Sequence, residues 1–253
     1  MFLEPPVTKE NVLDALRTTR NELAAEYDKK YGAEIEQLAE DLAVSYDLLY
    51  SVINSEEVKK IPDNHFYSFV LCWTGLNTIV AAIDLFRGGY PREPQMLMRN
   101  AIEIFASAYD IRRNEDKYNL LITDHTKFDS TRSIAALKEL VPMVGSLYGR
   151  LSDMFTHVSP LHMIPHKSET PLCIGGMFDP KEQIEMEMNL TLLRANVDVM
   201  NCVIEFILMP YIESPRYWKR VESGDYQLIP GGGKGRAIMN RMEELVEEIK
   251  KKS

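Results

Sequence analysis

The sequence predicts an all-α protein, a helical bundle of about seven main helices in which most neighbours run antiparallel. Apolar residues recur at intervals of three and four along nearly the whole chain, which is the spacing of one face of an α-helix. No run of residues alternates convincingly between apolar and polar side chains, as a half-buried strand would. The helical stretches are separated by short turns, and short turns place consecutive helices side by side in opposite directions.

The first two helices are predicted on either side of a glycine. Thr8 has the side chain of an N-cap, so a helix is expected over 9–30, and Gly32 is expected to end it. A second helix is expected over 33–54, because its apolar residues form one stripe before the turn at 61–64.

A third helix is predicted over 66–86, closed by two consecutive glycines. Residues 66–83 include no charged side chain, but serine, threonine and asparagine interrupt the apolar run. A membrane span usually needs about 20 predominantly apolar residues. We therefore expect a central helix packed on all sides, and no membrane partner.

The next helices are predicted over 93–113 and over about 130–140, the latter capped by Asp129 or Ser130. A helix bearing Arg150 and His157 should follow. Pro160 and Pro165 then prevent regular helix, so the histidines beyond them are expected in an irregular loop.

A long helix is predicted over 181–209, because Asp179 and Pro180 form a helix-starting pair and an apolar stripe follows. The chain is therefore expected to divide into a bundle domain, 1–222, and an appendage, 223–253. The appendage combines a flexible glycine-rich joint with a terminal helix over 237–252, which docks on the bundle or on a partner.

Net charge limits the partners. The chain has 38 acidic and 29 basic residues and a net charge of −9, so its field repels nucleic acid and anionic lipid. Any contact with RNA would have to be local. The three cysteines are odd in number and far apart, which is typical of a reducing compartment. Without a signal-peptide pattern at the N-terminus, we expect a cytoplasmic protein.

A narrow polar stripe is predicted on the helix over 93–113, on an otherwise apolar surface. It consists of Gln95, Arg99, Glu103 and Asp110. The stripe is too thin for a solvated face. Arg99 and Glu103 either line a cleft, where they would hold and orient a ligand anion, or form an intrahelical ion pair one turn apart.

The stretch from Tyr148 to His166 contains three of the five histidines together with an arginine and an aspartate. Arg150, Asp153 and His157 fall on one helical face, because spacings of three and seven residues return to nearly the same azimuth. Asp153 can orient the imidazole of His157, and Arg150 can stabilise a phosphate or an oxyanion. The same residues also describe an ordinary solvated helix face.

A metal or nucleotide cofactor is not predicted. His157, His162 and His166 match no zinc-ligand spacing, although together they leave open a metal-dependent hydrolase. The glycines at 231–233 precede Lys234, but the Ser or Thr of a phosphate-binding loop is missing.

Arg150 and His157, with six residues between them, resemble the R-x4-6-H motif of the HEPN superfamily. These are all-helical domains that often dimerise, and many are metal-independent RNases of toxin and antiviral systems. The resemblance implies that a 2′-hydroxyl attacks its adjacent phosphate, with His157 moving the proton and Arg150 stabilising the transition state. It also implies a homodimer that brings two such faces together.

A second set of residues is similar to uncharacterised bacterial helical proteins. Those proteins pair an R-x3-E helix, here Arg99 and Glu103, with a Y-x3-S-x4-H segment, here Tyr148, Ser152 and His157. No function accompanies this likeness. It makes Arg99, Glu103, Tyr148, Ser152 and His162 candidate ligand-binding residues. The alternative to an RNase is thus a non-catalytic module that binds a small ligand or a protein partner between these helices.

Overall fold

The computed structural model describes residues 8–152, 183–222, 224–229, 241 and 244–245, and it confirms an all-α bundle. Short 3₁₀ or π turns occupy 15–19, 56–60, 125–127 and 209–211. The elements are α1 (Lys9–Asp14), α2 (Arg20–Ile53), α3 (Asp63–Arg87), α4 (Glu93–Arg113), α5 (Glu115–Thr123), α6 (Ser130–Leu140), α7 (Met143–Leu151), α8 (Gln183–Leu208), β1 (Trp218–Arg220) and β2 (Tyr226–Leu228).

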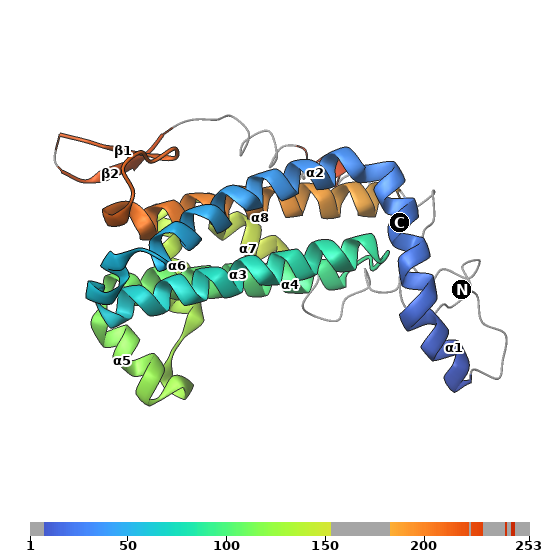
Figure 1. The fold of residues 1–253 in the computed structure, drawn as a ribbon, viewed down its shortest axis with the longest axis horizontal. Coiled ribbons are helices and arrows are strands. Elements are labelled where there is room, and N and C mark those ends of the chain that lie inside the picture. Colours follow the sequence, from blue (N-terminus) through green and yellow to red (C-terminus); the bar gives the residue numbers. More distant parts are fainter. Residues whose placement is uncertain (1–7, 153–182, 223, 230–240, 242–243, 246–253) are drawn as a thin grey trace.

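The long helices lie side by side, with α1 and α5 projecting at opposite ends (Figure 1). Helix α4 is the centre of the packing and contacts α3, α5, α6, α7 and α8. Its bounds are those predicted from the sequence. The apolar side chains along it, including Met98, Phe105 and Ile111, are fully buried. Burial on this scale makes α4 the structural axis of the bundle.

The predicted helix end at Gly32 is wrong, because α2 continues through it with only a kink. The kink lies at Tyr31, whose φ of −121° and ψ of 16° are not helical. Tyr27 and Tyr31 are buried before the glycine, and both rings pack against Phe86 with centroids 5.3 and 5.6 Å away. An internal glycine costs a helix about 1 kcal/mol. Leu38 and Leu42 are buried after the glycine, and burial on both sides of Gly32 offsets that cost, so the chain bends and does not stop.

Helix α3 is not packed on all sides, contrary to the expectation from its uncharged sequence. Its inner face, with Phe69, Cys72 and Leu76, is fully buried. On its outer face Phe66, Tyr67, Val70 and Val80 are 38 to 45% exposed. Within the described part of the chain, α3 is the one helix that is long and apolar enough to cross a membrane, judged by length and composition alone.

A two-stranded hairpin follows α8 and was not predicted. Strands β1 and β2 pair antiparallel across the expected boundary between residues 222 and 223. The buried carboxylate of Glu205 on α8 accepts hydrogen bonds from the backbone N–H groups of Tyr217 (2.6 Å) and Trp218 (3.2 Å). The Trp218 indole donates to the carbonyl of Cys202 at 2.8 Å. Strands of three residues are too short to show alternation, and α8 holds them in place.

The C-terminal segment touches the bundle where it is described. The side chain of Leu245 is fully buried in the core, and Arg241 forms an ion pair with Glu187 of α8 at 2.9 Å. At these residues the terminal segment docks on the bundle, one of the two outcomes expected for it. The rest of the predicted helix over 237–252 lies outside the described residues.

The close approach of α3 and α4 depends on Gly75. A Cβ at this position would lie 2.5 Å from the Phe105 ring, whereas a Cβ at Gly149 of α7 would meet nothing within 4 Å. We predict that Gly75→Ala lowers the free energy of unfolding by about 1–3 kcal/mol through overpacking. Gly149→Ala should raise it by about 0.4–1 kcal/mol, because it restricts the unfolded chain.

Urea denaturation of both variants and the wild type measures these changes. A Gly75→Ala protein as stable as Gly149→Ala would contradict the close α3–α4 packing.

Candidate functional site

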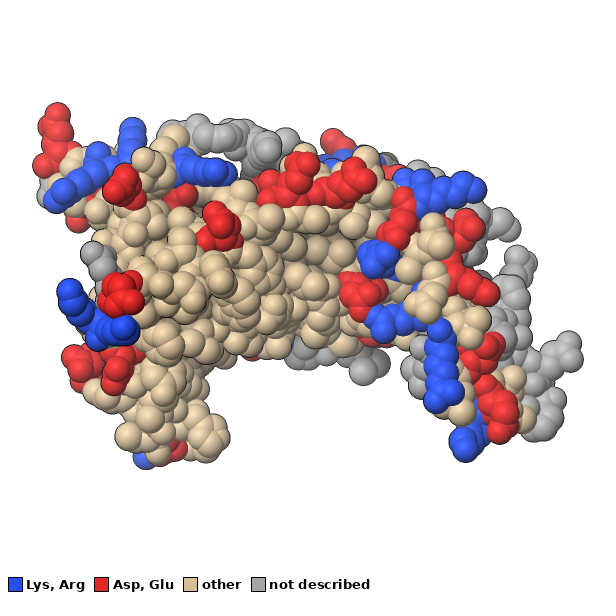
Figure 2. Space-filling view, in the orientation of Figure 1, with Lys and Arg blue, Asp and Glu red and all other residues tan. Residues whose placement is uncertain are grey.

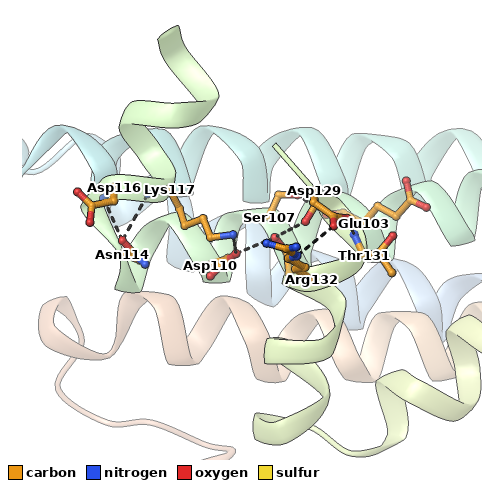
Figure 3. A network of polar contacts seen from close by, with 10 residues as sticks. Glu103, Ser107, Asp110, Asn114, Asp116, Lys117, Asp129, Thr131 and Arg132 are labelled. Atoms are coloured by element: carbon orange, nitrogen blue, oxygen red, sulfur yellow. Dashed lines mark hydrogen bonds and ion pairs between the residues drawn. The ribbon is translucent and has the colours of Figure 1, made fainter. Parts of the chain in front are cut away.

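The polar stripe of α4 is confirmed as a row of contacts with the surrounding helices. At one end Gln95 donates to Asn189 of α8 at 2.6 Å. At the other end Asp110 accepts from Ser133 of α6 at 2.8 Å and lies 3.7 Å from Lys117 of α5. Figure 3 shows the Asp110 end of the stripe, where residues of α4, α5 and α6 meet. The two ends of the stripe therefore fix different neighbours against α4.

The middle of the stripe joins α4 to α7 through four side chains, here called the Arg99 cluster: Arg99, Glu103, Tyr148 and Ser152. Arg99 donates from Nε to the Ser152 hydroxyl at 3.1 Å and from Nη2 to the Tyr148 hydroxyl at 2.7 Å. Tyr148 in turn donates to Oε1 of Glu103 at 2.8 Å. The same oxygen lies 2.9 Å from Nη2 of Arg99, so the predicted intrahelical ion pair is also present.

The cluster forms because one turn of α4 faces the last turn of α7. Arg99 and Glu103 are four residues apart, as are Tyr148 and Ser152, so each pair lies along one side of its helix. Val144, Leu147 and Leu151 on α7 are fully buried, which fixes the rotation of α7 against the core. Tyr148 and Ser152 lie at the margin of this buried face and reach α4. The two motifs, 45 residues or more apart in sequence, thus meet in space.

Tyr148 is held as a neutral donor. Burial raises the pKa of its phenol, and the hydrogen bond to the Glu103 carboxylate raises it further, while the Arg99 guanidinium acts in the opposite direction. The guanidinium carbon of Arg99 lies 5.0 Å from the centre of the Tyr148 ring. A protonated phenol between a guanidinium and a carboxylate relays one hydrogen bond to the next.

Part of the hydrogen-bonding capacity of the cluster is unused. Among the described residues, Nη1 of Arg99 and Oε2 of Glu103 form no hydrogen bond. The two side chains are 28 and 24% exposed. The cluster thus retains one donor and one acceptor on two partly exposed side chains. Because the charges of Arg99 and Glu103 cancel, the cluster favours a neutral polar group over a polyanion.

Arg150 lies on a different side of α7. It is half-buried and two residues from both Tyr148 and Ser152, which turns it about 200° around the helix axis from either one. The Arg99 cluster and the predicted Arg150 face are therefore separate surfaces. Asp153, His157, His162 and His166 lie outside the described residues. Their shared face with Arg150 stays a prediction.

Metal-ligand clusters of three or more His, Cys, Asp or Glu side chains are absent from the described part of the chain. Two of the three cysteines are described, and both are free thiols. Burial raises the pKa of Cys72 and raises that of Cys202 to about 12, so neither is a reactive thiolate at neutral pH.

A second polar cluster, of His65, Arg112 and Tyr211, was not predicted. The guanidinium of Arg112 contacts Nε2 of His65, and Nδ1 of His65 lies 2.6 Å from the Tyr211 hydroxyl. Because a guanidinium only donates, Nε2 accepts and Nδ1 carries the proton. Arg112 also donates to the carbonyl of Ile207 at 3.3 Å. These residues belong to segments far apart in sequence, so no local spacing indicates them.

Comparisons of the chain with protein-family models, with curated proteins and with solved structures found no match.

His65 should make folding stability depend on pH. Burial and the nearby Arg112 charge lower its pKa from 6.5 to about 4. The folded state therefore binds fewer protons than the unfolded state between these values. The neutral His65 stabilises the fold fully above about pH 6.5, and this contribution is lost as pH falls toward 4.

We predict that His65→Asn flattens the rise in unfolding free energy between pH 4 and 6.5, measured by urea denaturation at several pH values. His125→Asn, at an exposed histidine after α5, serves as the control and should keep the wild-type slope. Equal slopes in the wild type and His65→Asn would show that His65 is not the titrating group.

Proposed function

We propose that this protein is a non-catalytic helical module that binds a small polar ligand at the Arg99 cluster. One observation carries the proposal: four side chains from α4 and α7 hold each other in place, while Arg99 Nη1 and Glu103 Oε2 stay available at a partly exposed edge. Side chains fixed before binding lose little entropy when a ligand arrives.

The ligand is expected to carry an acceptor beside an N–H donor. Arg99 Nη1 donates and Glu103 Oε2 accepts, so the matching group presents the reverse pattern. Carboxamides and the edges of nucleobases have this pattern. The net charge of −9 on the chain also disfavours a highly anionic ligand.

Binding can be measured by calorimetry with two probe sets, free nucleosides and small primary carboxamides. We predict that Glu103→Gln and Arg99→Lys each weaken binding about 10- to 100-fold, because each removes a charged hydrogen-bonding partner. Glu139→Gln, at an exposed glutamate of α6, is the matched control and should bind as the wild type does. If neither probe set binds, or if both variants bind normally, the proposal fails.

The second candidate is the metal-independent RNase, which the Arg150 and His157 spacing supports. In this proposal His157 transfers the proton, Asp153 orients it and Arg150 stabilises the pentacovalent phosphate, with a homodimer supplying two faces. It uses a different side of α7 from the Arg99 cluster. The two functions therefore depend on different residues and can be tested separately.

We predict for this candidate that single-stranded RNA is cleaved in the presence of EDTA, and that His157→Ala and Arg150→Ala each reduce the rate about 10²- to 10⁴-fold. Arg132→Ala, at an exposed arginine of α6, should retain the rate. Cleavage that survives in both variants would belong to a contaminant. Cleavage that requires added divalent metal would instead favour the hydrolase expected from His157, His162 and His166.

A further inference from the structure

The outer face of α3 has an uncharged stripe with the spacing of a helix–helix seam. The stripe consists of Tyr67, Val70, Thr74, Asn77 and Ala81, and every one of these residues is exposed. Their separations are three, four, three and four residues. This alternation keeps side chains on one line along a helix that packs against another at a crossing angle of about 20°. Helices α2 and α5 flank the line without covering it: Tyr46 of α2 donates to Oδ1 of Asn77 at 2.7 Å, and Tyr118 of α5 lies beside Tyr67.

The charge distribution makes this face the one where two copies can approach each other. Charged side chains lie at the two ends of the molecule and along one edge, while the broad middle over α3 has almost none (Figure 2). Two chains that each carry a charge of −9 repel each other overall. Contact through a charge-free surface keeps like charges away from the centre of an interface.

The face is also complementary to itself. At one end Phe66 and Tyr67 project, 38 and 42% exposed, and Tyr118 of α5 supports Tyr67 with ring centroids 5.2 Å apart. At the other end lies an open hollow of about 670 Å³ between α2 and α3. Its apolar lining includes Ile35, Val80, Ala81 and Ile83, and its charged rim consists of Asp28, Glu36, Asp84 and Arg87. The projecting rings and the hollow lie on the same helix, as a two-fold interface requires.

Thr74 lies midway between the two features, seven residues from Tyr67 and seven from Ala81. A two-fold axis through Thr74 therefore places Tyr67 of each copy against Ala81 of the other, a large side chain against a small one. Residue 74 then faces residue 74 of the partner.

The available area suits a stable dimer. Helix α3 has 25 residues, which corresponds to a length of about 37 Å. Together with the adjoining strip of α2, about two helix widths, the face covers roughly 700 Å². A standard specific interface buries about 800 Å² on each partner.

We propose that this protein forms a homodimer through antiparallel packing of α3 against α3 of a second copy, with the two-fold axis at Thr74. The proposal is independent of the ligand-binding function, because the Arg99 cluster is made by α4 and α7.

Substitution at the two-fold axis tests the proposal on the full chain. Thr74 is exposed, and its hydroxyl donates only to the carbonyl of Val70 in its own helix, so an arginine is expected to fold normally there. In a dimer, Thr74→Arg places two positive charges face to face, and we expect the dissociation constant to rise about 100-fold or more. Thr131→Arg, at an exposed threonine of α6, is the matched control and should leave it unchanged.

The most specific test mixes two variants of the protein. Thr74→Arg and Thr74→Glu should each be monomeric alone, and a mixture should form a one-to-one heterodimer, because residue 74 meets its own counterpart. Sedimentation velocity up to about 100 µM, with circular dichroism to verify folding, measures this.

Three results would overturn the proposal. The first is a wild-type monomer at all concentrations, and the second is a Thr74→Arg dimer as tight as the wild type. The third is flotation of the wild type with uncharged phosphatidylcholine vesicles that Thr74→Arg abolishes, which would assign the face to a membrane surface.

Discussion

The packing of α4 is the constraint on which the rest of the structure depends. It is surrounded by other helices, yet a row of polar side chains runs along it. A buried polar group without a partner costs about 1–3 kcal/mol, so each of these side chains needs a partner on the helix that covers it. Asn189 of α8, Tyr148 of α7 and Ser133 of α6 supply these partners, while Oε1 of Gln95 forms no hydrogen bond within the described part of the chain. Hydrogen bonds along α4 thus select which neighbour lies where, while apolar burial supplies most of the stabilisation.

This constraint also produces the Arg99 cluster. The cluster contributes to packing, as the other contacts of the stripe do, but it differs from them in one respect. Gln95 is fully buried, whereas Arg99 and Glu103 are about a quarter exposed and retain one unused donor and one unused acceptor. A partly exposed pair of this kind is suited to binding a ligand, because the contacts that hold the helices together also hold the ligand-facing atoms in position.

Helix α3 shows how one sequence property can have two structural meanings. The absence of charge over residues 66–83 is what a buried helix requires, and its inner face is indeed in the core. The outer face is also uncharged, but its apolar side chains are exposed to solvent. Composition alone cannot separate these cases, because only the arrangement of neighbouring helices determines which side is covered. An uncovered apolar face on a strongly acidic chain favours an interface between copies.

Helix periodicity and capping residues predicted the fold class and the bounds of α4, α6 and most of α3 and α8, because these signals are local. The resemblance to helical proteins with R-x3-E and Y-x3-S-x4-H segments marked Arg99, Glu103, Tyr148 and Ser152 as candidate ligand-binding residues. Tertiary structure decided the rest. Helix α2 continues past Gly32 because Tyr27 and Tyr31 are buried against Phe86. Tertiary structure also paired the short strands after α8 through Glu205, and it joined His65, Arg112 and Tyr211 across segments that share no local pattern. Contacts between distant parts of the chain depend on how helices rotate and pack, and no spacing within one helix encodes them.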